Sequence, residues 1–291
     1  MEGQPKGFGS IVPHSVREFA NDDLRWAIHR AILFNRIDVL QLEYTNMGQY
    51  AGRFRQIPSV LFEHDIYFQS VGRALGRMRG VLRKTAAAFE YLRAIRYELR
   101  MLASVDRIQV CSRDNKEHLV GFLPRLTQRI EEGLRAGIDT AHYQFQTTGR
   151  ELDTMLFLGS FRHVPNQEAL DWFVRRVFPL ILERRPSARL IVIGSEPPPR
   201  HSLPDLPNIE MIGFAEDVLE PLRRYALFVC RIRSGSGVRV KLLEAFAAGI
   251  PVVSTRLGAE GLARTDGEVC ALADTPEEFA TRAVSMLEYP E

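Results

Sequence analysis

Lysine is scarce in this chain of 291 residues, and one of its few lysines stands where it could do chemistry. Lys241 and Glu244 follow the glycine-rich stretch RIRSGSGV, which itself follows the apolar run ALFVC. Gly235 and Gly237 can bring main-chain N–H groups close to a ligand, because glycine takes conformations closed to other residues. A helix that begins near Gly237 would add free N–H groups and a positive dipole end, which together suit a phosphate.

The spacing behind this loop orders the polar groups along one helix face. Seven residues separate Gly237 from Glu244, so the two share a face, and Lys241 lies about 60° from Glu244 on the same side. The order of N–H groups, ammonium and carboxylate fits a nucleoside diphosphate, with Lys241 on the phosphates and Glu244 on the ribose hydroxyls. A plainer alternative stays open, in which Lys241 and Glu244 form an ion pair on a solvated helix.

The elements that must position these residues are clear in the second half of the chain. Continuous apolar strands alternate with amphipathic helices, which predicts a parallel sheet covered on both faces, a doubly wound α/β domain. The expected strands are 155–160, 188–194, 209–214, 226–230, 251–254 and 268–273, and the expected helices lie near 166–184, 216–225, 237–248 and 276–288.

The first half predicts a second, Rossmann-like α/β domain. Its expected strands are 37–43, 58–64 and 106–112, and a long helix is expected over about 79–102. We place the boundary so that residues 1–140 form the first domain and residues 141–291 form the second.

Composition predicts a globular protein of the reducing cytoplasm. Charged residues make up 25%, the longest apolar runs are too short for a membrane span, and the first residues lack the apolar core of a signal peptide. Cys111, Cys230 and Cys270 lie in apolar contexts without metal spacing, which predicts core thiols. No metal site, cofactor or nucleic-acid partner is expected.

Positive charge is concentrated in residues 71–100, which hold eight basic and two acidic residues. Arg93, Arg96 and Arg100 run along one stripe of the expected long helix. Such a stretch could dock on anionic lipid, which would place the protein peripherally at the inner membrane face. The alternative is a solvated arginine-rich helix.

The stretch RIRSGSGVRVKLLEAFAAGIPVVSTRLGAEGL resembles the donor-site signature of the family 4 glycosyltransferases, which have the GT-B fold. The stretches FLGSFRHVPNQEALDWF, LIVIGSEPP and IEMIGFAEDV agree with that family in order, and GIDTAHYQF is similar to its interdomain segment. Weaker likenesses in DVLQLEYTNMGQYA and LFEHD extend the resemblance to the first half.

This resemblance implies two Rossmann-like domains, an acceptor-side domain over residues 1–140 and a donor-binding domain over residues 141–291, and a retaining, metal-independent transfer from a nucleotide-diphosphate sugar. The family's first domain opens with several strands and a glycine-rich loop, and each β-α-β unit needs about 30 residues or more. Only 36 residues precede Ile37, so we expect an incomplete first domain and a chain truncated at both ends. The acceptor would be a hydroxyl of a glycan or of a lipid-linked molecule, as in the synthesis of a cell-envelope polysaccharide. The resemblance also implies that Glu244 holds the ribose, that basic residues bind the diphosphate, and that His64 faces the sugar. We assign Lys241 and His64 as catalytic residues, and the resemblance gives transition-state stabilisation that is mainly electrostatic.

Two positions depart from the family pattern and shift the expected charge to other residues. Ser236 stands where many members carry a second glutamate, and Ser160 stands where many carry an arginine. Arg162, Arg239 and Lys241 are the residues expected to supply the positive charge instead.

Several assignments remain open from the sequence. His64 is either a site residue or a polar cap at a strand end, and Phe214 either packs near the base or belongs to the core. Glu43, at another strand end, could act on the acceptor side. A truncated chain could also be a non-catalytic nucleotide-sugar-binding or interaction module. Another GT-B enzyme, such as a nucleotide-sugar epimerase, fits the family 4 pattern less well.

Overall fold

The structure, a computed structural model, describes residues 11–76, 78, 80–133, 137–204, 206–232 and 235–288. These residues form two compact units, each with its own apolar core. Unit 1 comprises the described residues of Met1–Arg135 together with Gly235–Val238, and unit 2 comprises those of Ala136–Ser234 and Arg239–Glu291. None of the helices that the described residues form has the length and apolarity needed to cross a membrane.

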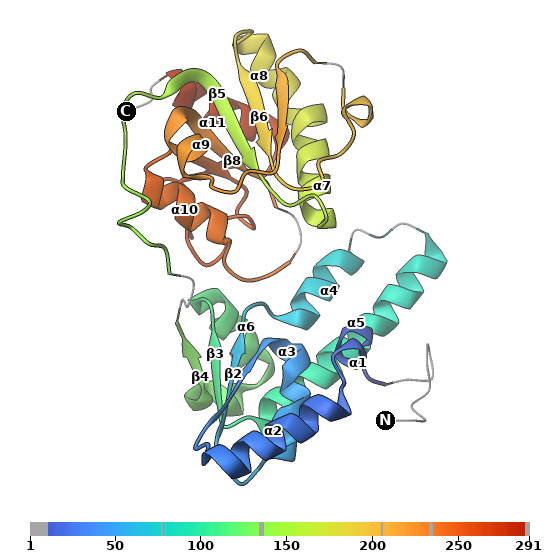
Figure 1. The fold of residues 1–291 in the computed structure, drawn as a ribbon. Helices are drawn as coiled ribbons and strands as arrows, with labels where there is room; N and C mark the ends of the chain where they lie inside the picture. The colour runs from blue at the N-terminus through green and yellow to red at the C-terminus, as the bar shows by residue number, and fades with distance from the viewer. Residues whose placement is uncertain are drawn as a thin grey trace. The chain divides into compact units, whose positions relative to one another are not determined.

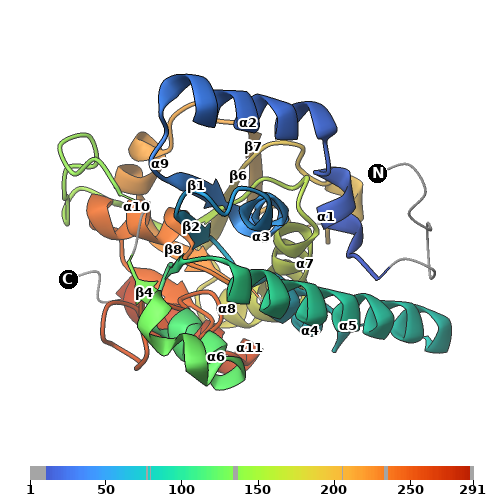
Figure 2. The same ribbon diagram turned by 90° about the horizontal axis from the view of Figure 1, so that it is seen from below.

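Unit 1 is built on a parallel sheet whose four strands follow one another in chain order (Figure 1). The strands are β1 Leu40–Glu43, β2 Ser59–Glu63, β3 Arg107–Val110 and β4 Ile130–Glu132. The helices are α1 His14–Glu18, α2 Asp22–Asn35, α3 Tyr44–Met47, α4 Tyr67–Leu75, α5 Val81–Ser104 and α6 Arg113–Phe122, with short 3-10 segments η2 Gly48–Arg53 and η3 Pro124–Arg129. Figure 2 shows the long helix α5 next to α4, against which it packs.

Unit 2 is built on a six-stranded parallel sheet in the order β10-β9-β8-β5-β6-β7. The strands are β5 Glu151–Leu158, β6 Arg189–Ile193, β7 Ile209–Gly213, β8 Tyr225–Cys230, β9 Val252–Ser254 and β10 Ala271–Leu272. The chain winds from β5 to one side of the sheet and then returns to β8 on the other side. The order therefore reverses between the neighbouring strands β5 and β8, which is the doubly wound arrangement.

Helices cover both faces of this sheet because its central strands are apolar on both sides. On one face lie α7 Val164–Trp172, the π-helical turn η4 Phe173–Val177, α8 Phe178–Arg184 and α11 Pro276–Glu288. On the other face lie α9 Leu219–Arg224 and α10 Val240–Ala248. Alternation along β5 shows the division: Phe157 contributes to the first core, whereas Leu156 and Leu158 contribute to the second.

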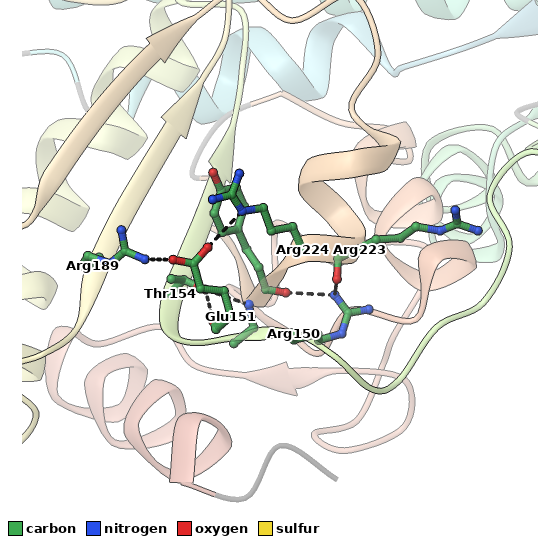
Figure 3. A network of polar contacts seen from close by, with 8 residues as sticks. Arg150, Glu151, Thr154, Arg189, Arg223 and Arg224 are labelled. Atoms are coloured by element: carbon green, nitrogen blue, oxygen red, sulfur yellow. Dashed lines mark hydrogen bonds and ion pairs between the residues drawn. The ribbon is translucent and has the colours of Figure 1, made fainter.

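A charged network joins the elements at the amino end of β5 (Figure 3). Glu151 begins that strand and pairs with Arg189 of β6 and with Arg224 at the end of α9. Arg150 lies beside it, and its guanidinium donates to main-chain carbonyl groups, among them those of Leu222 and Tyr225, at 2.6 and 2.9 Å. These contacts join the strands and helices at the amino edge of the sheet. The loops that follow the strands lie at the opposite, carboxyl edge.

The predicted fold class is confirmed, with one parallel α/β sheet in each unit. The strands expected in the second half are present, although the last is only the two-residue β10. In the first half, α1, α2 and β4 were not expected. Cys230 and Cys270 are buried as predicted, whereas Cys111 is only half-buried.

One boundary that matters for the site was predicted wrongly. The helix expected to begin near Gly237 begins at Val240, after Arg239 in an extended conformation. Gly235 and Gly237 both have left-handed φ angles, +87° and +82°, which a helix cannot continue through. The argument that three polar features share one helix face therefore holds only for Lys241 and Glu244.

Candidate functional site

The carboxyl edge of the unit 2 sheet carries the ammonium group of the half-buried Lys241 at the point where the strand order reverses. Lys241 Nζ donates to the carbonyl oxygen of Leu158, the last residue of β5, at 2.9 Å. It also donates to Asn166 Oδ1 in α7 at 3.4 Å, and it lies 5.7 Å from the centre of the Phe157 ring. The crevice beyond the carboxyl ends at such a reversal is where open α/β sheets bind ligands.

The sequence of α10 explains why Lys241 reaches this place. Leu242, Ala245 and Ala248 form the buried face of the helix, against the core that contains Leu158. Lys241 stands next to that face, one residue into the helix, so its side chain passes along the edge of the core towards the end of β5. An amphipathic stem can follow apolar surface in this way and deliver its charge to a polar spot.

The electrostatics of Lys241 favour an anion at this spot. Burial lowers the pKa of Lys241 below its usual value, and the positive charge of Arg239 lowers it further. The acceptors of the ammonium are a carbonyl and an amide oxygen, both neutral, and within the described part of the chain it has no ion pair. A buried cation among neutral acceptors gains most from a ligand that brings negative charge.

Glu244 lies one turn further along α10, on the side of the helix that faces the segment before β5. Its carboxylate accepts a hydrogen bond from the hydroxyl of Tyr143 at 3.2 Å. Burial, and then the charge of Glu244, raise the pKa of Tyr143 to about 12. The simpler alternative from the sequence was an ion pair between Lys241 and Glu244. The structure contradicts it, because each side chain has a different partner.

Arg162 and Phe214 follow β5 and β7 and so lie at the same edge of the sheet as Lys241. Arg162 donates through Nε and Nη2 to Glu196 Oε1, at 3.1 and 2.6 Å, and both side chains are exposed. The ring of Phe214 is 74% exposed, so the alternative that it packs in the core is wrong. Arg239, the residue before α10, is half-buried.

The loop residues Gly235, Ser236 and Gly237 group with unit 1. The Ser236 hydroxyl accepts from the Ile66 N–H at 2.6 Å and donates to the Ile66 carbonyl at 3.2 Å. A Cβ on Gly237 would lie 2.2 Å from the carbonyl oxygen of His64, so only glycine fits there. The loop N–H groups were expected to cradle phosphates. That expectation stays a prediction, and the structure shows that this loop packs tightly on the chain after β2.

His64 and Glu43 meet at the carboxyl ends of β2 and β1. His64 Nε2 lies 2.8 Å from Glu43 Oε2, and its ring stacks on Tyr44 with centroids 4.1 Å apart. An ionised carboxylate only accepts hydrogen bonds, so this contact requires a proton on Nε2 of the imidazole. Both side chains are half-exposed, and the contact with Glu43 orients the His64 ring. From the sequence, His64 could have been only a polar cap at a strand end.

The basic stretch 71–100 is less uniform than its sequence suggests. Arg93 is buried, pairs with Glu90 at 3.0 Å and lies over the Phe89 ring, so it does not belong to an exposed basic stripe. Arg73 donates to the carbonyl of Gly235 at 2.6 Å. Arg77 and Arg79 lie outside the described residues.

Tyr143 and Asn166 were missed as site residues by sequence reasoning. The stretch GIDTAHYQF had been singled out only as a connecting segment, and Asn166 had been singled out for no role at the site. Nothing in their own spacing links them to α10, because the contacts span 101 and 75 residues. Among the described residues, no group of three or more metal-binding side chains comes together.

Comparison with known proteins relates this site to a described family. Residues 153–289 match the family described as glycosyl transferases group 1. The matched region covers most of unit 2. It contains Arg162, Phe214, Lys241 and Glu244, whereas Tyr143 lies just before it.

One curated relative and several solved structures resemble the chain as well. An uncharacterized 44.6 kDa protein in the cps region of Klebsiella pneumoniae is 27% identical over 142 residues, which cover 45% of this chain and 36% of that protein. The chain thus spans little more than a third of that relative. The sucrose-phosphate synthase of Thermosynechococcus elongatus has a TM-score of 0.68 and 14% identity, covering 98% of this chain and 73% of its own.

Anabaena HepE in complex with UDP-glucose has a TM-score of 0.66 and 12% identity, covering 91% and 72% of the two chains. The UDP-forming α,α-trehalose-phosphate synthase of Burkholderia xenovorans, in complex with glucose-6-phosphate, has a TM-score of 0.64 and 13% identity, covering 95% and 70%. The TM-scores of these structures show that the chain shares the GT-B fold with them. At identities this low, the similarity is one of fold alone.

Proposed function

We propose that this protein transfers a sugar from a nucleotide-diphosphate sugar to an acceptor hydroxyl, and that the nucleotide binds on unit 2. The observation that carries the proposal is the half-buried ammonium of Lys241 at the reversal point of the sheet, inside the region that matches the group 1 glycosyl transferases. That ammonium has only neutral partners among the described residues, and a diphosphate would supply the missing negative charge.

The nucleotide's parts can be assigned to the residues of unit 2. Lys241 meets the diphosphate, and Glu244, one turn or about 4.5 Å further along the axis, accepts the ribose hydroxyls. The exposed ring of Phe214 offers a surface for the base. Arg162 and Arg239 add positive charge near the phosphates, and the phosphate contacts expected of Gly235, Ser236 and Gly237 stay a prediction.

Catalysis in this proposal is mainly electrostatic. The bond between the anomeric carbon and the diphosphate oxygen breaks, and Lys241 stabilises the negative charge that the leaving diphosphate gains. His64, oriented by Glu43, is proposed to face the sugar from unit 1. We further propose retention of the anomeric configuration and no requirement for a metal or a cofactor.

The acceptor is proposed to be a hydroxyl of a glycan or of a lipid-linked molecule in the synthesis of a cell-envelope polysaccharide. The Klebsiella relative is described as a protein in a cps region, and this supports that choice. We propose a cytoplasmic site of action, with peripheral contact at the inner membrane face. The second candidate function is a nucleotide-sugar-binding module without transfer activity, which would use the same residues of unit 2.

Titration of nucleosides and nucleoside diphosphates against two variants tests the donor site. Lys241→Ala should weaken uridine or guanosine diphosphate about ten- to 150-fold and leave the bare nucleoside nearly unchanged, because the ammonium contacts only the phosphates. Glu244→Ala should weaken both ligands. Arg175→Ala, which removes an exposed ion pair with Asp171 on α7, is the matched control and should change neither.

Equal binding of every ligand by all three variants would contradict the donor site. Transfer and hydrolysis of nucleotide-sugars, measured beside binding and with and without EDTA, separate the two candidate functions. Binding without turnover favours the module, and loss of turnover on chelation would contradict metal independence.

A further inference from the structure

A pocket lies in unit 1, on the carboxyl-terminal half of α5, within the basic stretch 71–100 for which contact with a membrane is proposed above. It has a volume of about 340 Å³, within the usual range for small-ligand pockets. Three segments form it: the first described residues, the 3-10 segment η2 and α5. The residues that matter here are Ile11, Gly48, Gly52, Arg96, Arg100 and Met101. We call it the α5 pocket.

The charge of the α5 pocket is positive and uncompensated. Arg96 and Arg100 stand four residues apart, on neighbouring turns of one helix face, where like charges repel. No aspartate or glutamate is among the residues that line the pocket, and within the described part of the chain neither guanidinium has an ion pair or a hydrogen bond. An anion between them would remove the repulsion and accept two forked sets of N–H donors.

The nearby acidic side chains of α5 are committed elsewhere. Glu90 pairs with Arg93 two turns earlier, at 3.0 Å. Glu98 is fully buried and accepts hydrogen bonds from the main-chain N–H groups of Tyr67 and Phe68, at the start of α4. Glu90 and Glu98 are the two acidic residues of this helix. Neither side chain can turn towards the α5 pocket without losing those contacts.

The floor of the α5 pocket is apolar. Met101 lies under η2 so closely that a Cβ on Gly48 would come within 2.3 Å of its sulfur atom. Gly52, the second glycine of η2, has open space where its Cβ would be, with no atom within 4 Å. Ile11, 63% exposed, adds apolar surface at the rim. Thioether and aliphatic surface beside two guanidinium groups suits a ligand that is both apolar and anionic.

We propose that the α5 pocket binds a phosphate ester that carries an alkyl chain. The phosphate oxygens accept from Arg96 and Arg100, and the first carbons of the chain lie on Met101 and Ile11. A phospholipid headgroup in a bilayer and a single soluble amphiphile share this chemistry. The inference does not rest on the nucleotide site, which belongs to unit 2, so either can fail without the other.

Soluble short-chain lipids test the pocket directly. The full chain should bind dihexanoyl phosphatidic acid at least tenfold more tightly than either inorganic phosphate or dihexanoyl phosphatidylcholine, measured by calorimetry. Affinity should fall with salt, because the charges are near the surface. The double change Arg96→Gln with Arg100→Gln should weaken the anionic lipid at least tenfold.

A variant that blocks the pocket without changing its charge keeps the test independent of electrostatics. Gly52→Leu adds a side chain to a residue that lines the pocket, at a position where a Cβ meets no atom within 4 Å, and should weaken lipid binding while the far-ultraviolet circular dichroism stays unchanged. Arg83→Gln with Lys84→Gln removes two charges from the other end of α5 and should change lipid affinity less than twofold. Nucleoside diphosphate binding should be the same in all these proteins.

Three results would overturn the proposal: equal binding of the lipid by the double variant, equal binding by Gly52→Leu, or inorganic phosphate binding as tightly as the lipid. Vesicles then identify the source of the ligand. Binding to phosphatidic acid vesicles that also depends on Arg96 and Arg100 supports a bilayer headgroup. Binding of the soluble lipid alone supports a single amphiphile.

Discussion

Tyr143 and Lys241 show how a single contact changes the interpretation of a residue. From the sequence, Lys241 and Glu244 could have formed a surface ion pair; in the structure Lys241 reaches the end of β5, and Glu244 accepts from Tyr143. The chemical type of each residue was predictable, because the glycine loop, the lysine and the carboxylate stand close together in sequence. Their partners were not, because those partners are set by the folding of distant segments against α10.

Tyr143 is expected to position Glu244. Its raised pKa, about 12, keeps the hydroxyl protonated at neutral pH, so it remains a donor to the carboxylate. Tyr143→Phe should weaken uridine or guanosine binding roughly three- to tenfold, since a hydrogen bond to a charged group is lost, and less than Glu244→Ala does. Tyr225→Phe, which removes a hydroxyl elsewhere in unit 2, should leave affinity unchanged. Isothermal titration of the nucleoside with the three variants decides this, and wild-type affinity in Tyr143→Phe would refute the positioning role.

At the scale of elements, the helices were easier to predict than their ends. The strands of unit 2 carry continuous apolar runs, and these alone were enough to expect them. The start of α10 was misplaced by three residues because glycine is compatible with both a helix start and a left-handed turn. Strand β4 was missed because it has three residues and only one of them, Ile130, is buried.

Arg150 holds the carboxyl ends of α9 and α10 at the amino edge of the sheet (Figure 3). Its Nη1 donates to the carbonyls of Leu222, Arg223 and Tyr225, and its Nη2 donates to those of Gln146 and Ala248. One guanidinium thus satisfies carbonyl groups that helix ends leave without partners. Burial lowers the pKa of Arg150, in keeping with its enclosed position.

Arg150→Lys should therefore destabilise unit 2. A lysine has three donors at one point and cannot reproduce the fork, so buried carbonyls lose partners at a cost of about 2–4 kcal/mol. Thermal unfolding of the variant should show a lower transition for unit 2. Arg224→Lys, at an exposed pair with Glu151, should cost less than about 1 kcal/mol. A variant Arg150→Lys as stable as the parent would show that the clamp is dispensable.

At the scale of the whole molecule, the two units have separate cores, and among the residues that the structure describes a pair of carboxyl groups is buried in unit 1 alone. The Thr45 hydroxyl lies 2.7 Å from Glu63 Oε2 and 3.3 Å from Glu98 Oε1. A hydroxyl has one proton to give, so both contacts are hydrogen bonds only if one of the carboxyl groups is protonated. Burial raises the pKa of Glu98 to about 8; burial and then the nearby Glu98 raise the pKa of Glu63 as well.

This pair predicts that unit 1 loses stability as pH rises, while unit 2 responds less. In the unfolded chain a glutamate loses its proton near pH 4.5, whereas folded Glu98 keeps it to about pH 8. The folded state thus binds more protons between these values, so its stabilisation is full below about pH 4.5 and is lost as pH rises towards 8. At about 1.4 kcal/mol per pH unit, the free energy of unfolding of unit 1 should fall by roughly 3 kcal/mol between pH 5 and pH 8. Glu98→Gln keeps the shape and removes one of the two raised carboxyl groups, so calorimetry should show a unit 1 transition that falls less over this range than the parent's and lies above it at pH 8. Glu131→Gln on β4, an exposed position of the same unit, should retain the parent's pH dependence. A parent protein equally stable at both pH values would show that the buried pair holds no proton.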